Sequence, residues 1–289
     1  AYAPKGKNGS AAYTPARGDE QLRSVAATTS QDYVLCVSSA GRVFQIAAHR
    51  IPAGTRAAKG EPTRKLFALL PGEEIVAALP LESFDEDRYL VTFSKLGKVK
   101  KSPLSDYKTA DVDGLQDMKL ADGDAVAAAL LARGQGEYLL TASNGQTLRF
   151  SDEVLRAQGR VGQGVAAMTL APKATIVSAS YLDSAQAADA SNFLSLLVVT
   201  ASGLTKKVPL SQYPQKGRAT AGVVTTELIG SDRVMLTMII NEEDIMLFVW
   251  DSADGEQVKV VKATEIKAFP RARKGVPMVS GKLLGIVKL

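Results

Sequence analysis

The chain has 289 residues, 46% of them hydrophobic, and a net charge of +5 from 35 basic and 30 acidic residues. This length allows one large or two ordinary domains with a buried core. No apolar run approaches the roughly 18 residues of a transmembrane helix, and no apolar stretch follows the basic start of the chain as in a signal peptide. The single cysteine, Cys36, has no internal disulfide partner and is expected in the core.

Five pairs of apolar runs, each joined by a glycine turn, recur along the chain. The turns contain Gly41, Gly97, Gly145, Gly203 and Gly255, at intervals of 48 to 58 residues. A strand, a tight turn whose glycine allows a positive φ, and a second strand form a β-hairpin. The pattern therefore predicts hairpins over residues 33–46, 88–101, 137–150, 195–208 and 245–260.

A second glycine follows each hairpin glycine by 17 to 20 residues. These glycines are Gly60, Gly114, Gly164, Gly222 and Gly275. Gly9 fits the same landmark of a further repeat whose hairpin would precede the first residue. The spacing therefore predicts six repeats of about 50 residues, five complete and one truncated at its start.

Equivalent positions in the repeats decide two ambiguous segments. Residues 125–134 are alanine-rich and would form a short helix on propensity alone. Their counterparts, 74–83 and 233–240, follow the same acidic turn, and the second is rich in strand formers, so we predict strands for all three. The polar segment 181–192 is predicted to be a surface insertion.

About four short strands per repeat, without sustained helical periodicity, predict an all-β radial array. The expected architecture is a six-bladed, propeller-like disc of four-stranded blades, with residues 1–289 as a single domain. A closed ring and a tightly turning open spiral would both hide most strand edges, and the sequence leaves both open. Two β-sandwiches are the alternative, but their strands would not keep one spacing along the whole chain.

Basic residues gather at two places in each repeat. Equivalent positions of a radial array face equivalent directions, so these residues are expected to form a belt that binds DNA. Those in the strand after the hairpin glycine are Arg42, Lys98, Lys100, Lys101, Arg149, Lys206 and Lys207, with Lys259 and Lys262 in the last repeat. Those in the loop before the second glycine are Lys5, Lys7, Arg56, Lys59, Arg160, Lys216, Arg218, Arg271, Arg273 and Lys274.

A cationic belt on a convex rim suits duplex DNA, because each phosphate carries a negative charge. Glycine beside the cations lets backbone N–H groups approach phosphate. The loops lack interleaved aromatic residues and the chain lacks a recognition helix, so backbone contacts with little base preference are expected. The alternative is that these lysines only keep strand edges soluble. The loop 107–115 is an exception, since it carries Asp111 and Asp113 instead of cations.

Catalytic motifs are not found in the sequence. A P-loop, a GxSxG nucleophile motif and a dinucleotide-binding glycine pattern are all missing. With one histidine, His49, and one cysteine, a His/Cys zinc site or a Cys–His pair is hard to build. The chain is therefore expected to be non-catalytic, with neither a metal site nor a cofactor of its own.

Residues 33–62, 87–107 and 203–213 resemble the C-terminal domain of the bacterial DNA gyrase A protein, and the related domain of topoisomerase IV. The resemblance covers nearly the whole chain. It implies a six-bladed β-pinwheel, in which neighbouring blades exchange a strand, and a rim that binds and wraps duplex DNA without sequence specificity.

The same resemblance implies a cytoplasmic, nucleoid-associated part of an ATP-dependent type II topoisomerase. This part would present a DNA segment for strand passage and supercoiling. The remainder of the gyrase A polypeptide and the separate ATPase subunit would be its partners and would use ATP and Mg²⁺, and no membrane would be involved.

One stretch departs from the gyrase pattern. The family carries a Gln-Arg-Arg-Gly-Gly-x-Gly box, whereas residues 3–9 keep only Lys5, Gly6, Lys7 and Gly9 of its basic, glycine-rich character. We favour the gyrase interpretation and keep the topoisomerase IV domain as the alternative. A propeller-type protein-interaction scaffold is less favoured, because it needs an apolar or aromatic face and only 6% of the residues are aromatic.

Overall fold

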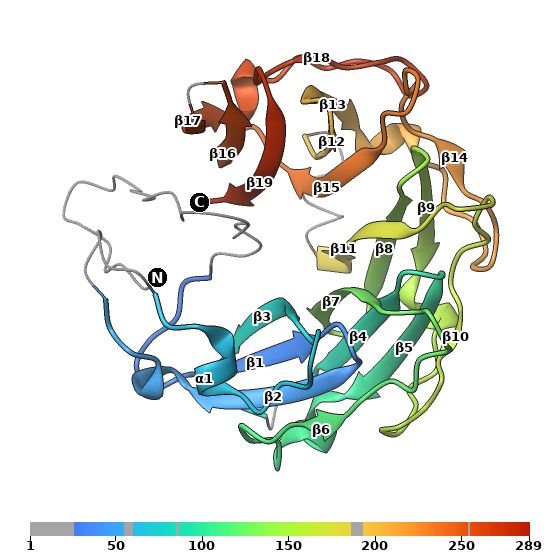
Figure 1. The fold of residues 1–289 in the computed structure, drawn as a ribbon. Coiled ribbons are helices and arrows are strands. Elements are labelled where there is room, and N and C mark those ends of the chain that lie inside the picture. The colour runs from blue at the N-terminus through green and yellow to red at the C-terminus, as the bar shows by residue number, and fades with distance from the viewer. Residues whose placement is uncertain (1–25, 55–59, 85–86, 186–192, 254) are drawn as a thin grey trace.

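A computed structural model describes residues 26–54, 60–84, 87–185, 193–253 and 255–289. It is an all-β structure in which five antiparallel sheets, here called blades 1 to 5 in chain order, follow one another around an arc (Figure 1). Within the described residues, blades 1 to 4 have four strands each and blade 5 has three. The all-β class and the propeller-like arrangement predicted from the repeats are therefore confirmed.

Every blade contains a β-hairpin, as predicted, which forms the middle of blades 1 to 4 and supplies the edge strand β17 and the central strand β16 of blade 5. The glycine in each hairpin turn has a φ between +74° and +94°, a region that residues with a Cβ rarely adopt. The hairpin strands are β1 (Tyr33–Ser38) and β2 (Arg42–Ala47), β4 (Tyr89–Ser94) and β5 (Lys98–Pro103), β8 (Gly136–Ala142) and β9 (Gln146–Ser151), β12 (Ser195–Thr200) and β13 (Leu204–Pro209), and β16 (Ile245–Ser252) and β17 (Gly255–Lys262).

A strand of seven or eight residues pairs with the first hairpin strand of each blade and lies on the inside of the arc (Figure 1). These inner strands are β3 (Ile75–Leu81), β7 (Val126–Ala132), β11 (Ile176–Asp183), β15 (Val234–Ile240) and β19 (Lys282–Lys288). The alanine-rich segment is thus the strand β7, as its place in the repeat predicted. The insertion predicted over 181–192 begins too early, because Tyr181–Asp183 still pair with β8; residues 186–192 lie outside the described chain.

A two-residue strand forms the outer edge of blades 1 to 4. These strands are β6 (Leu115–Gln116), β10 (Val165–Ala166), β14 (Val223–Val224) and β18 (Val276–Pro277). Each follows the second glycine of its repeat and pairs with the second hairpin strand of the preceding blade, as Leu115 does with Val43. Neighbouring blades therefore exchange a strand, as the resemblance implied.

The prediction of six blades is wrong, because the described residues form five. Each blade is built around a hairpin, and the sequence supplies five hairpins. The sixth repeat was counted from Gly9 alone, which lies outside the described residues. A loop glycine of this kind precedes only the short outer strand of a neighbouring blade, so it does not by itself indicate a further sheet.

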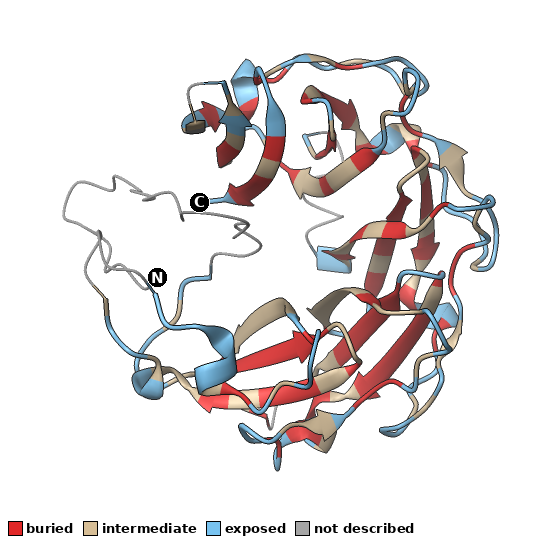
Figure 2. Cartoon of the chain, viewed as in Figure 1, coloured by how far each residue is buried: buried red, intermediate tan, exposed pale blue. Residues whose placement is uncertain are grey.

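Apolar side chains fill the space between neighbouring blades. Leu35 of blade 1 and Leu90 of blade 2 share one buried cluster, and Phe93 of blade 2 lies 5.7 Å from Tyr138 of blade 3 between ring centroids. Further clusters join blade 3 to blade 4 and blade 4 to blade 5. The hairpin strands of blades 2 to 4 are consequently mostly buried on both faces (Figure 2), whereas β17 of blade 5 is largely exposed. Cys36 is a buried free thiol, as expected.

The described helices are short. The single α-helix among them, α1 (Thr63–Leu66), is joined by five 3-10 turns that each follow a second hairpin strand. These turns are η1 (Ala48–Arg50), η2 (Leu104–Tyr107), η3 (Asp152–Val154), η4 (Leu210–Gln212) and η5 (Ala263–Glu265). A search of the described residues finds no helix with the length and hydrophobicity to cross a membrane.

Candidate nucleic-acid interface

Three loops run along the outside of the arc, where the sequence predicted cationic loops (Figure 1). We call residues 156–164, 214–222 and 267–275 the rim loops. Each follows the hairpin of one blade and ends at the outer strand, β10, β14 or β18, that it adds to the preceding blade. The rim loops therefore pass from one blade to the next along the outer edge.

Each rim loop contains an arginine followed directly by a non-glycine residue in the left-handed region. These residues are Val161 at φ +65°, Ala219 at +60° and Ala272 at +56°, and they follow Arg160, Arg218 and Arg271. In each case the N–H of the left-handed residue donates to the carbonyl of the residue after the previous outer strand. The three bonds are Val161 to Asp117 (2.8 Å), Ala219 to Ala167 (2.6 Å) and Ala272 to Thr225 (3.1 Å).

The arginines of the last two rim loops are anchored in the same way. Arg218 Nη1 donates to the Ala166 carbonyl (2.9 Å), and Arg271 Nη1 donates to the Val224 carbonyl (3.3 Å). Both acceptors are the second residue of an outer strand. The last two rim loops are thus each tied to the strand that ends the preceding rim loop, and this contact uses one N–H group of each guanidinium.

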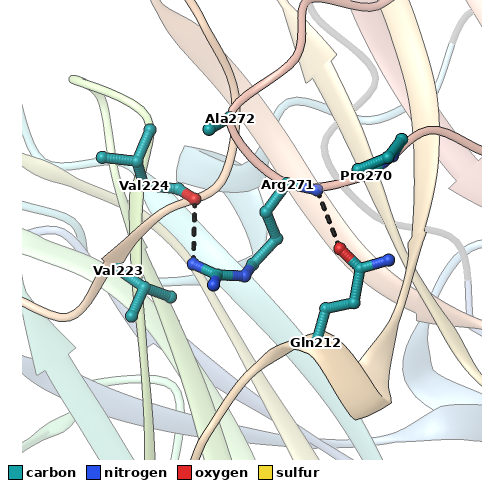
Figure 3. Close-up of a pocket in the computed structure, with 6 residues that line it drawn as sticks. All are labelled: Gln212, Val223, Val224, Pro270, Arg271 and Ala272. Carbon is teal, nitrogen blue, oxygen red and sulfur yellow. Dashed lines mark hydrogen bonds between the residues drawn. The ribbon is translucent and has the colours of Figure 1, made fainter.

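A shallow pocket lies beside Arg271. It is lined by Gln212, Val223, Val224, Pro270, Arg271 and Ala272 (Figure 3). The backbone N–H of Arg271 donates to Gln212 Oε1 (2.9 Å), while the buried Nε of Arg271 finds no hydrogen-bond partner among the described residues. The guanidinium is therefore held in place without having all of its donors used.

Four predicted cations of the rim loops are exposed. Arg160, Arg273 and Lys274 make no side-chain hydrogen bond or ion pair with a described residue, and Lys216 donates only to the Gly222 carbonyl (3.3 Å). Together with Arg218 and Arg271, they place six positive charges along the outer edge of three blade boundaries. Their role in binding DNA stays a prediction.

Lys100 and Lys101 on β5 do not point outward, contrary to the expectation of an external belt. The ammonium of Lys100 lies 2.7 Å from Asp117 Oδ1, and both side chains are buried. Asp117 also accepts from the hydroxyls of Tyr107 and Thr92. Burial raises the pKa of Tyr107 far above its ordinary value, and the nearby Asp117 carboxylate raises it further. The Tyr107 hydroxyl therefore keeps its proton.

The next residue, Lys101, is buried on the opposite face of the same strand. Its ammonium pairs with Asp152, which also accepts from the Tyr138 hydroxyl, and lies 4.4 Å from the ring centroid of Tyr89. Successive strand residues point to opposite faces, and here a neighbouring element covers each face. Lys100 and Lys101 thus neutralise internal carboxylates.

The lysines on β13 are also buried. Lys206 Nζ donates to three backbone carbonyls and not to a carboxylate, and burial lowers its pKa to about 8. Lys207 Nζ donates to Glu242 Oε1 (2.7 Å) and to the Ala263 carbonyl (3.0 Å). The donors of these two lysines are therefore satisfied inside the protein.

The two strand arginines are half-buried and paired with glutamates. Arg42 Nη1 donates to Glu73 Oε2 (2.7 Å), and Arg149 Nε donates to Glu137 Oε2 (2.7 Å). Arg149 also donates to carbonyls just before the second rim loop, at Leu210 and Tyr213. These guanidinium groups hold loops against their blades.

The other predicted site residues divide between the surface and the part that is not described. Lys98 is half-buried without a side-chain partner among the described residues, and Lys259 and Lys262 are exposed on β17. In the acidic loop, Asp111 and Asp113 are exposed, and Asp111 Oδ1 accepts from the Asp113 N–H. The residues outside the described chain are Lys5, Gly6, Lys7, Gly9, Arg56 and Lys59.

The left-handed residues Val161, Ala219 and Ala272 were missed from the sequence, although a signal was present. Each of their arginines stands four residues before the second glycine of its repeat. No group of three or more potential metal ligands is found among the described residues. The only histidine, His49, is exposed at the end of β2.

The fold and the repeated rim loops define a class of protein: an all-β propeller whose neighbouring blades exchange strands and whose outer loops carry arginine. A family profile described as the DNA gyrase C-terminal domain, β-propeller, matches residues 32–82, 88–133, 137–183 and 195–234. The chain belongs to this family.

The relatives and solved structures agree with that assignment. The DNA gyrase A protein of Mycobacterium leprae is 30% identical over 264 residues, covering 91% of the chain and 20% of the relative. A C-terminal domain of DNA topoisomerase IV matches with a TM-score of 0.78 at 23% identity, covering 90% of the chain and 80% of that structure. A DNA gyrase A C-terminal domain matches at 0.75 and 19%, covering 96% and 93%. At these identities the two structures support the fold only.

The chain spans about a fifth of the Mycobacterium leprae protein and about a third of its counterpart from Haemophilus influenzae (20% and 32%). It therefore corresponds to one part of a larger polypeptide in these relatives. The activity of the whole protein is treated below as a proposal.

Proposed function

We propose that the chain binds and bends duplex DNA along its rim loops, with little dependence on sequence. The observation that carries this proposal is the repetition of one arginine turn at three successive blade boundaries. Equivalent guanidinium groups repeated along a convex edge present one cation after another to the phosphates of a bent duplex. Arginine donates several N–H groups in a fixed plane, which suits phosphate oxygens.

Contacts at several boundaries are needed because bending is costly. Bending 20–30 bp by 40–90° requires roughly 1–6 kcal/mol. Each phosphate contact releases condensed counterions, and the logarithm of affinity then falls with the logarithm of salt by about 0.9 per contact. A row of cations can therefore offset the bending energy at low salt and lose that ability as salt rises.

The proposed setting is the DNA gyrase A protein. There the domain presents a DNA segment for ATP-dependent strand passage and supercoiling, while the remainder of that polypeptide and the ATPase subunit carry out the chemistry with ATP and Mg²⁺. The topoisomerase IV domain is the second candidate, because residues 3–9 keep only part of the gyrase box. Ligating a nicked plasmid with the chain bound distinguishes the two candidates, because the closed plasmid keeps the writhe that the chain constrained. Writhe with the hand of gyrase wrapping supports the gyrase domain. Absence of constrained writhe supports the topoisomerase IV domain.

Gel-shift titration on a duplex of about 100 bp at several salt concentrations tests DNA binding. The variant R160Q/R218Q/R271Q removes one arginine from each rim loop and should make the salt slope shallower by about 2.7. The matched control is R64Q/R133Q/R233Q, which removes three exposed arginines outside the rim loops. A complex absent at low salt, or equal effects of both variants, would contradict the proposal.

A further inference from the structure

A buried lysine lies beneath the last rim loop. Lys206, on β13, is 1% exposed, and its Nζ donates to the carbonyls of Thr225 (2.8 Å), Pro270 (3.0 Å) and Arg273 (2.6 Å). Pro270 and Arg273 are the two ends of one turn in the rim loop 267–275. The three N–H groups of an ammonium thus meet three acceptors, and one charged group ties both ends of the turn to the segment after β14.

This turn carries Arg271 and Arg273, and Lys274 follows it directly. Ala272, at φ +56°, donates its N–H to the same Thr225 carbonyl, and the Arg273 carbonyl accepts a second bond from Thr226 Oγ1 (3.2 Å). A left-handed alanine is held only where the surroundings impose it. Because the carbonyls of the turn face the buried ammonium, their partial negative charge is directed away from the surface on which a phosphate would lie.

Equivalent positions in the other blades show that packing does not require an ammonium here. Lys100, Leu148 and Lys206 each stand three residues after a hairpin glycine. Lys100 bonds to the Asp117 side chain, and Leu148 is a buried part of an apolar cluster. Of these three side chains, only that of Lys206 donates to carbonyls of the rim loop above it. Its charge is therefore connected to the conformation of that loop.

We propose that Lys206 is a positioning residue for DNA binding, which holds the turn Pro270–Arg273 so that Arg271, Arg273 and Lys274 face the DNA. This inference rests on the proposed function of the rim. A loop that is already ordered loses less conformational entropy on binding than a loop that must become ordered against the ligand. Lys206 thus contributes to DNA affinity without touching DNA.

The test compares K206M, the loop variant R271Q/R273Q/K274Q and their combination, all in the 289-residue chain. K206M should weaken binding to a duplex of about 100 bp roughly 5- to 10-fold. The combination should bind no more weakly than the loop variant, because Lys206 acts through the loop. Trypsin should cut K206M after Arg271, Arg273 or Lys274 several-fold faster. The control L148M, at the equivalent position of blade 3, should behave as the unchanged chain.

Circular dichroism establishes whether K206M folds; if it does not, T226V replaces it, since this isosteric change removes the other side-chain bond to the Arg273 carbonyl. The inference is overturned if the folded variant binds DNA as the unchanged chain does. It is also overturned if the losses of K206M and of the loop variant multiply in the combination, which is the result of a merely structural role. Failure of the unchanged chain to bind DNA would instead overturn the proposed function, and this inference with it.

Discussion

The substitution D117A tests whether the buried charges between blades act as pairs. Asp117 follows β6 and accepts from Lys100 Nζ at 2.7 Å, with side-chain exposures of 1% and 0%. It also accepts from the hydroxyls of Tyr107 and Thr92. Removing the carboxylate leaves a buried ammonium without its counter-charge, so we expect the free energy of unfolding to fall by about 3–5 kcal/mol.

The neighbouring blade supplies the apolar version of the same contact. Leu148 and Ala167 occupy the positions of Lys100 and Asp117 there, and both are fully buried. The double variant K100L/D117A copies this pair and removes both charges together. It should be more stable than D117A by about 1–2 kcal/mol, although Tyr107 and Thr92 lose an acceptor.

Denaturant unfolding followed by circular dichroism measures the cycle of D117A, K100L and the double variant. We expect a coupling free energy of at least about 1 kcal/mol between the two positions. Single losses that simply add in the double variant would refute the reasoning, because they would mean that the two charges do not stabilise one another. A binding titration on duplex DNA serves as the control, since neither side chain reaches the surface.

Further expectations concern backbone conformation and one titrating group. G222A should lower the free energy of unfolding by several kcal/mol more than G123A. Both glycines have φ near +76°, so the backbone strain is the same. A Cβ at Gly222 would lie 2.4 Å from the Thr147 carbonyl oxygen, whereas a Cβ at Gly123 would have nothing within 4 Å. V161G should raise the free energy of unfolding by about 0.5–1 kcal/mol, because a β-branched residue at φ +65° is strained; a loss of stability would contradict that strain. Burial lowers the pKa of Lys206 to about 8 in the folded chain, compared with about 10.5 in the unfolded chain. The buried charge therefore lowers the free energy of unfolding by its full amount below pH 8, and this loss disappears as the pH rises from 8 to 10.5. Denaturant unfolding should show stability rising faster with pH over this interval in the unchanged chain than in K206M, by at most about 1.4 kcal/mol per pH unit, and equal slopes would count against it.

The hairpins could be predicted from the sequence because their determinants are local. Gly41, Gly97 and the three equivalent glycines each close a turn that requires a positive φ, and the apolar runs on both sides have strand length. The outer strands β6, β10, β14 and β18 carry no such signal. Each has two residues and pairs with a strand from the preceding repeat, so its existence depends on the assembled blades. The blade count failed at that step, when Gly9 alone was taken as the mark of a sixth, truncated repeat.

Only some of the cations predicted for the candidate site lie on the surface. In a sheet with one solvent face, either Lys100 or Lys101 would point to water, since strand residues alternate between faces. Here both faces of β5 are covered, one by the segment after β6 and the other by blade 3. The rim loops, in contrast, have only one neighbouring surface, so Arg160, Arg273 and Lys274 remain exposed as predicted.

The rim loops share one backbone path, although the side chain beneath them differs from loop to loop. The left-handed residues Val161, Ala219 and Ala272 make equivalent N–H bonds of 2.6 to 3.1 Å. Below them lie an ion pair, an apolar pair and a lysine bound to carbonyls. The same loop therefore tolerates three chemistries, and a basic residue on the strand below need not be available to DNA. Six of the seven strand cations predicted on β2, β5, β9 and β13 have acceptors inside the protein. We therefore assign the proposed DNA contacts to the rim loops. Neutralising their arginines should weaken binding, whereas replacing the strand lysines should act mainly on stability or on the loops they hold.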